Sequence, residues 1–287
     1  MRKQAVRRKT YAVRKPKKKA AVFSGNLFRY SIVAFFIVLM LGLSYHYRNG
    51  LSYYFGFKSD KISRANREAK RISDVRNFQV LEKHQGKSIG IDVSEYQGEI
   101  SWSYVDTLEN KHPLHYVFIR ATVGKDRKDR KFEKNWLGAK ENKMIRGAYH
   151  YYRPNENSLE QAELFIKTVT LQKGDLPPVL DIEKLPKNQS IANLKLGLKR
   201  WLHAVESHYG VKPIIYSGES YYEDFLKEEF GDYLFWIANY NFYREEIAED
   251  WLFWQFTEKA QIAGIEGMVD LNVFNGDKNK LLSRCIK

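Results

Sequence analysis

The feature that most constrains the fold is an alternation, after Gly86, between short apolar runs and longer amphipathic stretches. The apolar runs are rich in Val, Ile, Tyr and Phe, residues that favour strands. The pattern predicts eight strands, at 88–93, 116–121, 146–151, 178–182, 213–217, 234–238, 252–256 and 269–274. Helical periodicity fills the earlier gaps, at 102–109, 131–142, 158–170, 191–209 and 221–229. Because little helix separates the last three strands, we expect an α/β barrel related to the (β/α)8 type with a depleted final third.

The N-terminal part of the chain differs in charge from the rest. Residues 1–29 hold 11 of the 48 Lys and Arg and no Asp or Glu, whereas residues 86–287 hold 28 basic and 30 acidic residues. The net charge of +14 therefore belongs to the N-terminal part, and the large C-terminal part is about neutral. This distribution argues against a nucleic-acid partner and predicts a basic cytoplasmic tail over 1–29.

An uncharged apolar run follows the tail, reading YSIVAFFIVLMLGLSY over 30–45. We predict a single transmembrane helix over 30–47, a juxtamembrane stalk over 48–85 and a folded domain over 86–287. The basic residues before the run predict a cytoplasmic N-terminus and export of everything after it. The alternative for the same run is a cleaved secretory signal, although no small-residue cleavage site follows it.

Four acidic residues lie at or near the ends of predicted strands. Asp92 ends IGID, Asp181 and Glu183 end PPVLDIE, and Asp270 lies in GMVDLNVF. Because side chains alternate along a strand, Asp181 and Glu183 are expected on the same side. Like charges held close raise one pKa, which supplies the protonated carboxyl that glycosidic cleavage needs. Two alternatives stay open: acids that cap loops or pair with Lys and Arg, and a divalent-metal site, for which no HExxH or EF-hand spacing is present.

Aromatic and amide side chains recur near the same strand ends. The candidates for substrate binding are Tyr96, Tyr149, Tyr151, Tyr216, Trp236, Tyr240, Trp254 and Gln255. Flat rings pack against the C–H faces of sugars, so their recurrence favours a sugar-lined cleft over packing alone. His150 is interpreted as a hydrogen-bonded barrel residue. The single cysteine, Cys285, excludes an internal disulfide framework and a cysteine-based metal cluster.

Taken together, eight segments resemble the family 25 glycoside hydrolases, the Chalaropsis-type lysozymes. They are GIDVSEYQGEISW (90–102), FIRATVG (118–124), IRGAYHYYRP (145–154), PPVLDIE (177–183), PIIYSG (213–218), FWIANY (235–240), WQFT (254–257) and GIEGMVDLNVFNG (264–276). The resemblance implies an irregular (β/α)5(β)3 TIM-like barrel. It also implies hydrolysis of the β-1,4 bond between N-acetylmuramic acid and N-acetylglucosamine in peptidoglycan. From the residues, we expect no cofactor and no metal.

The resemblance also implies roles for the four acids. Glu183 matches the proposed general acid, Asp181 its partner carboxylate, and Asp92 and Asp270 two further acids of the cleft. The N-acetyl group of the substrate would act as an internal nucleophile, and direct attack by water is the alternative.

Combined with the apolar run, the resemblance predicts a membrane-anchored muramidase. We expect a single-pass protein of the bacterial inner (cytoplasmic) membrane, attached through residues 30–47, with its catalytic domain (86–287) facing peptidoglycan glycan strands on the periplasmic or outer side. Two other functions stay open. One is a catalytically silent or partner-activated peptidoglycan-binding protein. The other is a hydrolase of chitin-like polymers, whose longer D-x-x-D-x-D-x-E motif is not present. Protein partners are not predicted.

Overall fold

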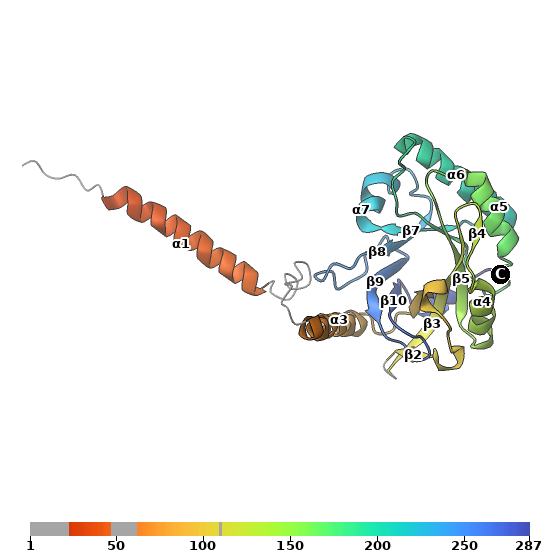
Figure 1. Cartoon of the computed structure of the whole chain (residues 1–287), viewed down its shortest axis with the longest axis horizontal. Coiled ribbons are helices and arrows are strands. Elements are labelled where there is room, and N and C mark those ends of the chain that lie inside the picture. The colour runs from red at the N-terminus through yellow and green to blue at the C-terminus, as the bar shows by residue number, and fades with distance from the viewer. Residues whose placement is uncertain (1–22, 47–61, 109–110) are drawn as a thin grey trace, which may run out of the picture. The chain divides into compact units, whose positions relative to one another are not determined.

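The computed structural model describes residues 23–46, 62–108 and 111–287 (Figure 1). The chain divides into two compact units, Met1–Gly56 and Phe57–Lys287. In the first unit the structure describes helix α1 (Phe23–His46), and the second unit holds the other described elements. Residues 1–22 of the predicted tail, residue 47, and residues 48–61 of the predicted stalk lie outside the described residues. The predicted domain boundaries therefore stay predictions.

No helix in the described part of the chain, α1 included, combines the length and the hydropathy needed to cross a membrane. The uncharged run at 30–45 is shorter than the about 20 apolar residues that a bilayer core requires. The prediction of a transmembrane helix over 30–47 is therefore wrong.

The second unit is built around a barrel whose strands pair in chain order. From β3 to β10 each strand of the barrel lies beside the next, and β1 pairs with both β3 and β10, which closes the sheet. Two short strands, β2 (Thr107–Leu108) and β4 (Arg127–Lys128), pair with the two ends of β3. The barrel strands are β1 (Ile89–Val93), β3 (His112–Val123), β5 (Ile145–Tyr151), β6 (Val179–Asp181), β7 (Ile214–Gly218), β8 (Leu234–Ala238), β9 (Phe253–Ala260) and β10 (Val269–Phe274).

The barrel is mixed, so the prediction of a TIM-like (β/α)5(β)3 barrel is wrong about the sheet. Strand β10 runs antiparallel to both β9 and β1, whereas β1, β3 and β5 to β9 are parallel to one another. A parallel neighbour requires a crossover of a dozen or more residues. Only residues 261–268 separate β9 from β10, so the chain turns back on itself.

Helices cover the outside of the barrel between the earlier strands (Figure 1). They are α4 (Phe132–Glu141), α5 (Ser158–Thr168), α6 (Ile191–Tyr209) and α7 (Glu219–Tyr221) with the π-helical turn η3 (Tyr222–Leu226). Helix α3 (Ile62–Lys83) precedes β1 and lies against β9. Residues 95–97 form the 3-10 turn η1 (Glu95–Gln97). The helix predicted at 102–109 is wrong, because this segment forms the 3-10 turn η2 (Trp102–Tyr104) and then pairs with β3 through β2.

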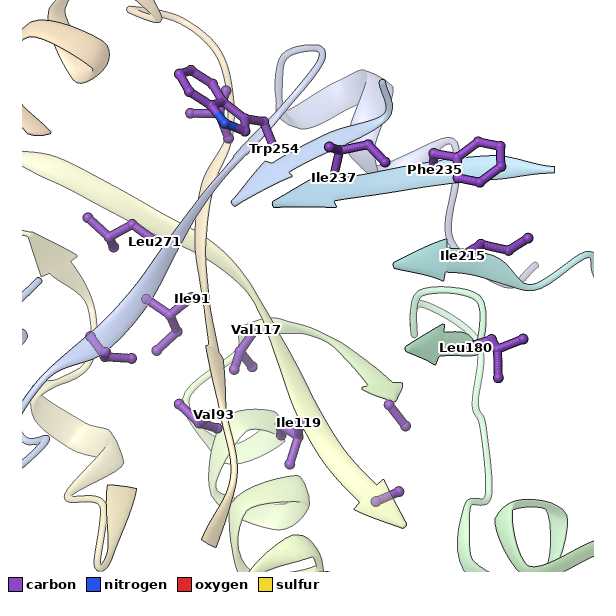
Figure 2. Close-up of a cluster of buried hydrophobic side chains, with 14 of the residues drawn as sticks. Ile91, Val93, Val117, Ile119, Leu180, Ile215, Phe235, Ile237, Trp254 and Leu271 are labelled. Atoms are coloured by element: carbon purple, nitrogen blue, oxygen red, sulfur yellow. The ribbon is translucent and has the colours of Figure 1, made fainter. Parts of the chain in front are cut away.

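Side chains alternate between the two faces of each strand, as the two-residue period of a strand requires. The outward-facing side chains are mostly aliphatic and pack beneath the helices; Figure 2 shows Ile91, Val93, Val117 and Ile119 among them. The inward-facing side chains of the barrel are largely aromatic. They form a second buried cluster that includes Tyr116, Phe118, Trp236, Phe253 and Phe274.

The inward aromatic rings are packed in direct contact. The rings of Phe118 and Trp236 stack with centroids 4.4 Å apart, and Phe118 and Phe253 meet edge to face at 5.1 Å. Two glycines make room for these rings: a Cβ atom at Gly90 would lie 2.5 Å from the ring of Tyr116, and one at Gly147 would lie 2.5 Å from the ring of Phe118. The lower barrel is therefore a packed aromatic core.

The C-terminal residues close the floor of the barrel. Helix α8 (Lys278–Leu282) brings Leu281 and the buried Cys285 against the inward aromatic cluster. The Ile286 backbone then pairs with the segment before β6: the Gly174 N–H donates to the Ile286 carbonyl (2.9 Å) and the Ile286 N–H donates to the Asp175 carbonyl (2.8 Å).

We predict that Gly147→Ala lowers the free energy of unfolding by about 1–3 kcal/mol, the range for overpacking a close-packed core. The added Cβ would force apart β5 and the ring of Phe118. Gly218→Ala is the matched control, since its Cβ would meet nothing within 4 Å. Urea unfolding of the two variants measures the difference. Equal stabilities would contradict the packing described here.

Candidate active site

A cavity of about 280 Å³ opens at the carboxyl ends of the parallel strands. Its lining includes all four predicted acids and seven of the eight predicted binding residues. The cavity receives Asp92 from β1, Asp181 from β6 and Asp270 from β10. Glu183 follows Asp181 by two residues and also lines the cavity. The predicted binding residues that line it are Tyr96, Tyr149, Tyr151, Tyr216, Trp236, Tyr240 and Gln255.

Asp92 and Asp270 face each other across the β1–β10 ladder and are hydrogen-bonded through their carboxyl groups. Burial, together with the neighbouring Asp92 charge, raises the pKa of Asp270 to about 9. Burial also raises the pKa of Asp92, and hydrogen bonds from Asn272 and Gln255 oppose that rise. The arrangement favours a protonated Asp270 that donates to an ionised Asp92 at neutral pH.

A hydrogen-bond network fixes the orientation of the two amides that contact Asp92. Asn272 Nδ2 donates to Asp92 Oδ2 (2.7 Å), and Gln255 Nε2 donates to the same oxygen (2.8 Å). Trp236 Nε1 donates to Asn272 Oδ1 (2.7 Å), and the Tyr216 hydroxyl donates to Gln255 Oε1 (2.7 Å). Because the indole can only donate, the Asn272 amide must turn its NH₂ group toward Asp92.

Asp181 and Glu183 differ in exposure although they lie two residues apart. Asp181 is 5% exposed, and its Oδ1 has no hydrogen-bond partner among the described residues. Burial, then the charges of Glu183 and Asp92, raise the pKa of Asp181 well above its ordinary value. Glu183 reaches solvent at the mouth; partial desolvation raises its pKa, and the Lys184 charge opposes this. Because the Glu183 charge raises the pKa of Asp181, protonation of Glu183 favours ionisation of Asp181.

Sequence reasoning missed Arg120, an inward residue of β3 that lines the cavity. Arg120 Nε donates to Asp129 Oδ2 (2.8 Å), and its guanidinium lies 4.7 Å from the ring centroid of Tyr96. Asp129 also accepts the Glu95 N–H (3.0 Å), so this ion pair fixes the turn that carries the 74% exposed Tyr96. An isolated arginine within the apolar run FIRATV is the signal that was available.

Glu258 and Asn272 were also missed. Glu258 lines the cavity because the β9–β10 register shifts between Leu271 and Asn272, which interrupts the alternation that starts from Gln255. No sequence pattern predicts such a shift. Asn272 lies two residues after Asp270 on the same strand, and the two-residue period that groups Asp181 with Glu183 would have found it.

Trp254 is the predicted binding residue that the structure does not bring to the cavity. It alternates with the inward Gln255 and points outward from β9 (Figure 2). Its indole is fully buried, donates to the Asn239 carbonyl (2.9 Å) and lies against His84. This placement corrects the prediction that Trp254 binds substrate. The interpretation of His150 is confirmed, since it is buried and hydrogen-bonded to Thr122 and Gln161.

We predict that the free energy of unfolding falls as pH rises from about 4 to about 9, the window between the ordinary and raised pKa of Asp270. In this window the folded state holds a proton that the unfolded state has lost, so rising pH favours unfolding. Asp270→Asn removes this proton and should flatten the slope, whereas the exposed Asp126→Asn should not. Urea unfolding across this pH range measures both. An unchanged slope in Asp270→Asn would show that Asp270 is ionised in the folded state.

Comparison with known proteins agrees with this geometry. Residues 91–265 match the sequence profile of glycosyl hydrolases family 25. YegX of Escherichia coli K12 is 42% identical over 196 residues, covering 67% of this chain and 71% of YegX. Lysozyme M1 of Streptomyces globisporus is 32% identical over 209 residues, covering 68% of this chain and 70% of that protein. A solved family 25 glycosyl hydrolase from Bacillus anthracis matches with a TM-score of 0.63 and 30% identity, covering 70% of this chain and 95% of that one. The chain therefore belongs to glycosyl hydrolase family 25.

Proposed function

We propose that this chain is a muramidase that hydrolyses the β-1,4 bond between N-acetylmuramic acid and N-acetylglucosamine in peptidoglycan. The observation that carries the proposal is the meeting of Asp181 and Glu183 with the Asp92–Asp270 pair in one cavity of a family 25 chain. Similarity to Lysozyme M1 supports the substrate class. We further propose that the domain works outside the cytoplasm, where peptidoglycan lies.

Glu183 is the proposed general acid. It lies at the mouth of the cavity, so its carboxyl can reach a glycosidic oxygen of a polymer bound across the strand ends. Its raised pKa keeps a larger share of the group protonated near neutral pH than an ordinary glutamate would. Glu183 would donate this proton to the leaving oxygen as the glycosidic bond breaks.

Asp181 is the proposed partner that orients the substrate's acetamido group. Its buried Oδ1 has no hydrogen-bond partner among the described side chains and backbone groups, and an acetamido N–H is a donor of the required kind. Such a bond stabilises the ionised form of Asp181. Glu183 then remains the protonated carboxyl of the two. The amide oxygen can then attack the anomeric carbon while Glu183 protonates the leaving group, and water opens the intermediate.

The aromatic lining supports a sugar ligand. Tyr149 and Tyr216 both contact the Trp236 ring edge to face, with centroid distances of 6.4 Å and 4.5 Å. All three line the cavity together with the acids. Rings fixed in this way offer flat surfaces to the C–H faces of a pyranose at low cost in side-chain entropy.

We predict that Glu183→Gln lowers the rate of glycan cleavage by about 10²- to 10⁴-fold, because a positioned general acid contributes about that factor. The assay is digestion of purified peptidoglycan, followed by borohydride reduction and mass spectrometry to detect new reduced muramic acid ends. The exposed Glu163→Gln, on α5, is the control and should match the parent.

Each result of this digestion bears on the proposal. New ends from the parent chain and none from Glu183→Gln would support it. A Glu183→Gln protein as fast as the parent would refute the role of Glu183. A parent chain that binds glycan without cutting it would favour the alternative of a silent or partner-activated binding protein.

We predict that kcat/KM falls as pH rises through the raised pKa of Glu183, because the free enzyme then loses its acid proton. Lys184 lowers that pKa through its charge. Lys184→Met should therefore move the alkaline limb of the profile to higher pH. Lys187→Met serves as the control for a change in overall charge. A limb that stays in place in Lys184→Met would mean that another group sets it.

A further inference from the structure

Helix α3 lies outside the family-matched residues 91–265, yet it is packed into the catalytic unit. Its C-terminal half buries Val80 and Leu81, and Arg76 is only 6% exposed. A buried guanidinium is costly unless acceptors satisfy its donors. The contacts of Arg76 therefore indicate which segments of the catalytic unit the helix stabilises.

Arg76 joins two segments that are apart in sequence. Nη1 donates to the Phe256 carbonyl, and Nη2 donates to the Asn241 carbonyl (3.1 Å). Phe256 lies in β9, whereas Asn241 lies in the β8–β9 loop, residues 239–252. The guanidinium also lies 5.8 Å from the ring centroid of Trp254. Its planar fork suits two carbonyls at once.

Each of these carbonyls belongs to the residue that follows a cavity residue. Asn241 follows Tyr240, and Phe256 follows Gln255. The Tyr240 hydroxyl donates to Gln255 Oε1, and Gln255 Nε2 donates to Asp92 (2.8 Å). Arg76 thus binds the backbone next to Tyr240 and next to Gln255. The side chains of these two residues are hydrogen-bonded to each other in the cavity.

Two further contacts tie the same loop to the end of α3. Lys83 pairs with Glu245 at 2.5 Å, and His84 Nε2 accepts the Ile247 N–H (3.1 Å). Within the loop, Asn239 holds Trp254 through its carbonyl. The loop has no helix of its own, so much of its order depends on contacts made from outside.

We infer that α3 is a positioning element of the active site, in which Arg76 holds Tyr240 and Gln255 in the geometry that orients Asp92. This inference rests on the proposed function. Arg76 acts through the two backbone carbonyls that it binds. Trp254 provides the surface on which the helix lies.

The test compares full-length Arg76→Met with Val80→Ala, which removes part of the buried packing of α3 but leaves both hydrogen bonds of Arg76 in place. Arg76→Met should lower kcat on soluble N-acetylglucosamine–N-acetylmuramic acid oligomers by about 10- to 100-fold, the range for a small misplacement of reacting groups. Val80→Ala should leave kcat unchanged at temperatures where both variants are folded. Arg76→Lys, which keeps a donor but lacks the fork, replaces Arg76→Met if that variant does not fold.

A double-mutant cycle identifies the route of the effect. If Arg76 acts through Tyr240, then Arg76→Met added to Tyr240→Phe should lower kcat no further than the slower single variant. Multiplied losses would overturn the inference, as would a kcat for Arg76→Met equal to that of Val80→Ala.

Amide hydrogen exchange separates failure of this inference from failure of the proposed function. Exchange over 239–247 should be faster in Arg76→Met than in Val80→Ala. Equal exchange would overturn the inference whatever the activity. A parent chain that cleaves no glycan would refute the proposed function, while faster exchange in Arg76→Met would still support the positioning of the loop.

Discussion

The antiparallel placement of β10 between β9 and β1 is the constraint on which the site depends. Its two ladders close the barrel, which would otherwise present unpaired strand edges at β1 and β9. The same ladders set Asp270 opposite Asp92 and Asn272 opposite Gln255. The strand pairing that closes the sheet therefore also places the residues of the Asp92 hydrogen-bond network next to one another.

Gathering four carboxyl groups in one cavity is unfavourable, and the fold offsets this cost unevenly. Asp92 receives two amide donors, and Asp270 shares a hydrogen bond with it. Asp181 Oδ1 lacks a described partner. Keeping unsatisfied or protonated acids in a cavity costs stability, and such a cost is typical of a site arranged for a reaction. The aromatic core below, from Phe118 to Phe274, provides compensating packing.

Much of the barrel and the four acids could be predicted from local pattern, because strand alternation and apolar content are properties of short segments. The direction of β10 could not, because it depends on how eight strands meet. Trp254 and Gln255 are adjacent, and no local signal says which of them points inward. Residues 102–109 do not form the predicted helix, because β2 pairs with β3, and this pairing overrides the helical periodicity. The docking of Arg76 joins residues 165 and 180 positions apart, beyond any motif.

Because the C-terminal residues close the floor of the barrel, the chain's single thiol can report on local opening of that floor. Cys285 lies 8% exposed against the aromatic core, and burial raises the pKa of its thiol to about 11. Burial and the raised pKa slow its reaction with reagents that modify thiolates, so opening of the floor should speed that reaction. The rate of alkylation of Cys285 therefore measures local opening of the barrel at the side opposite the cavity. The measurement introduces no label and alters no residue of the site.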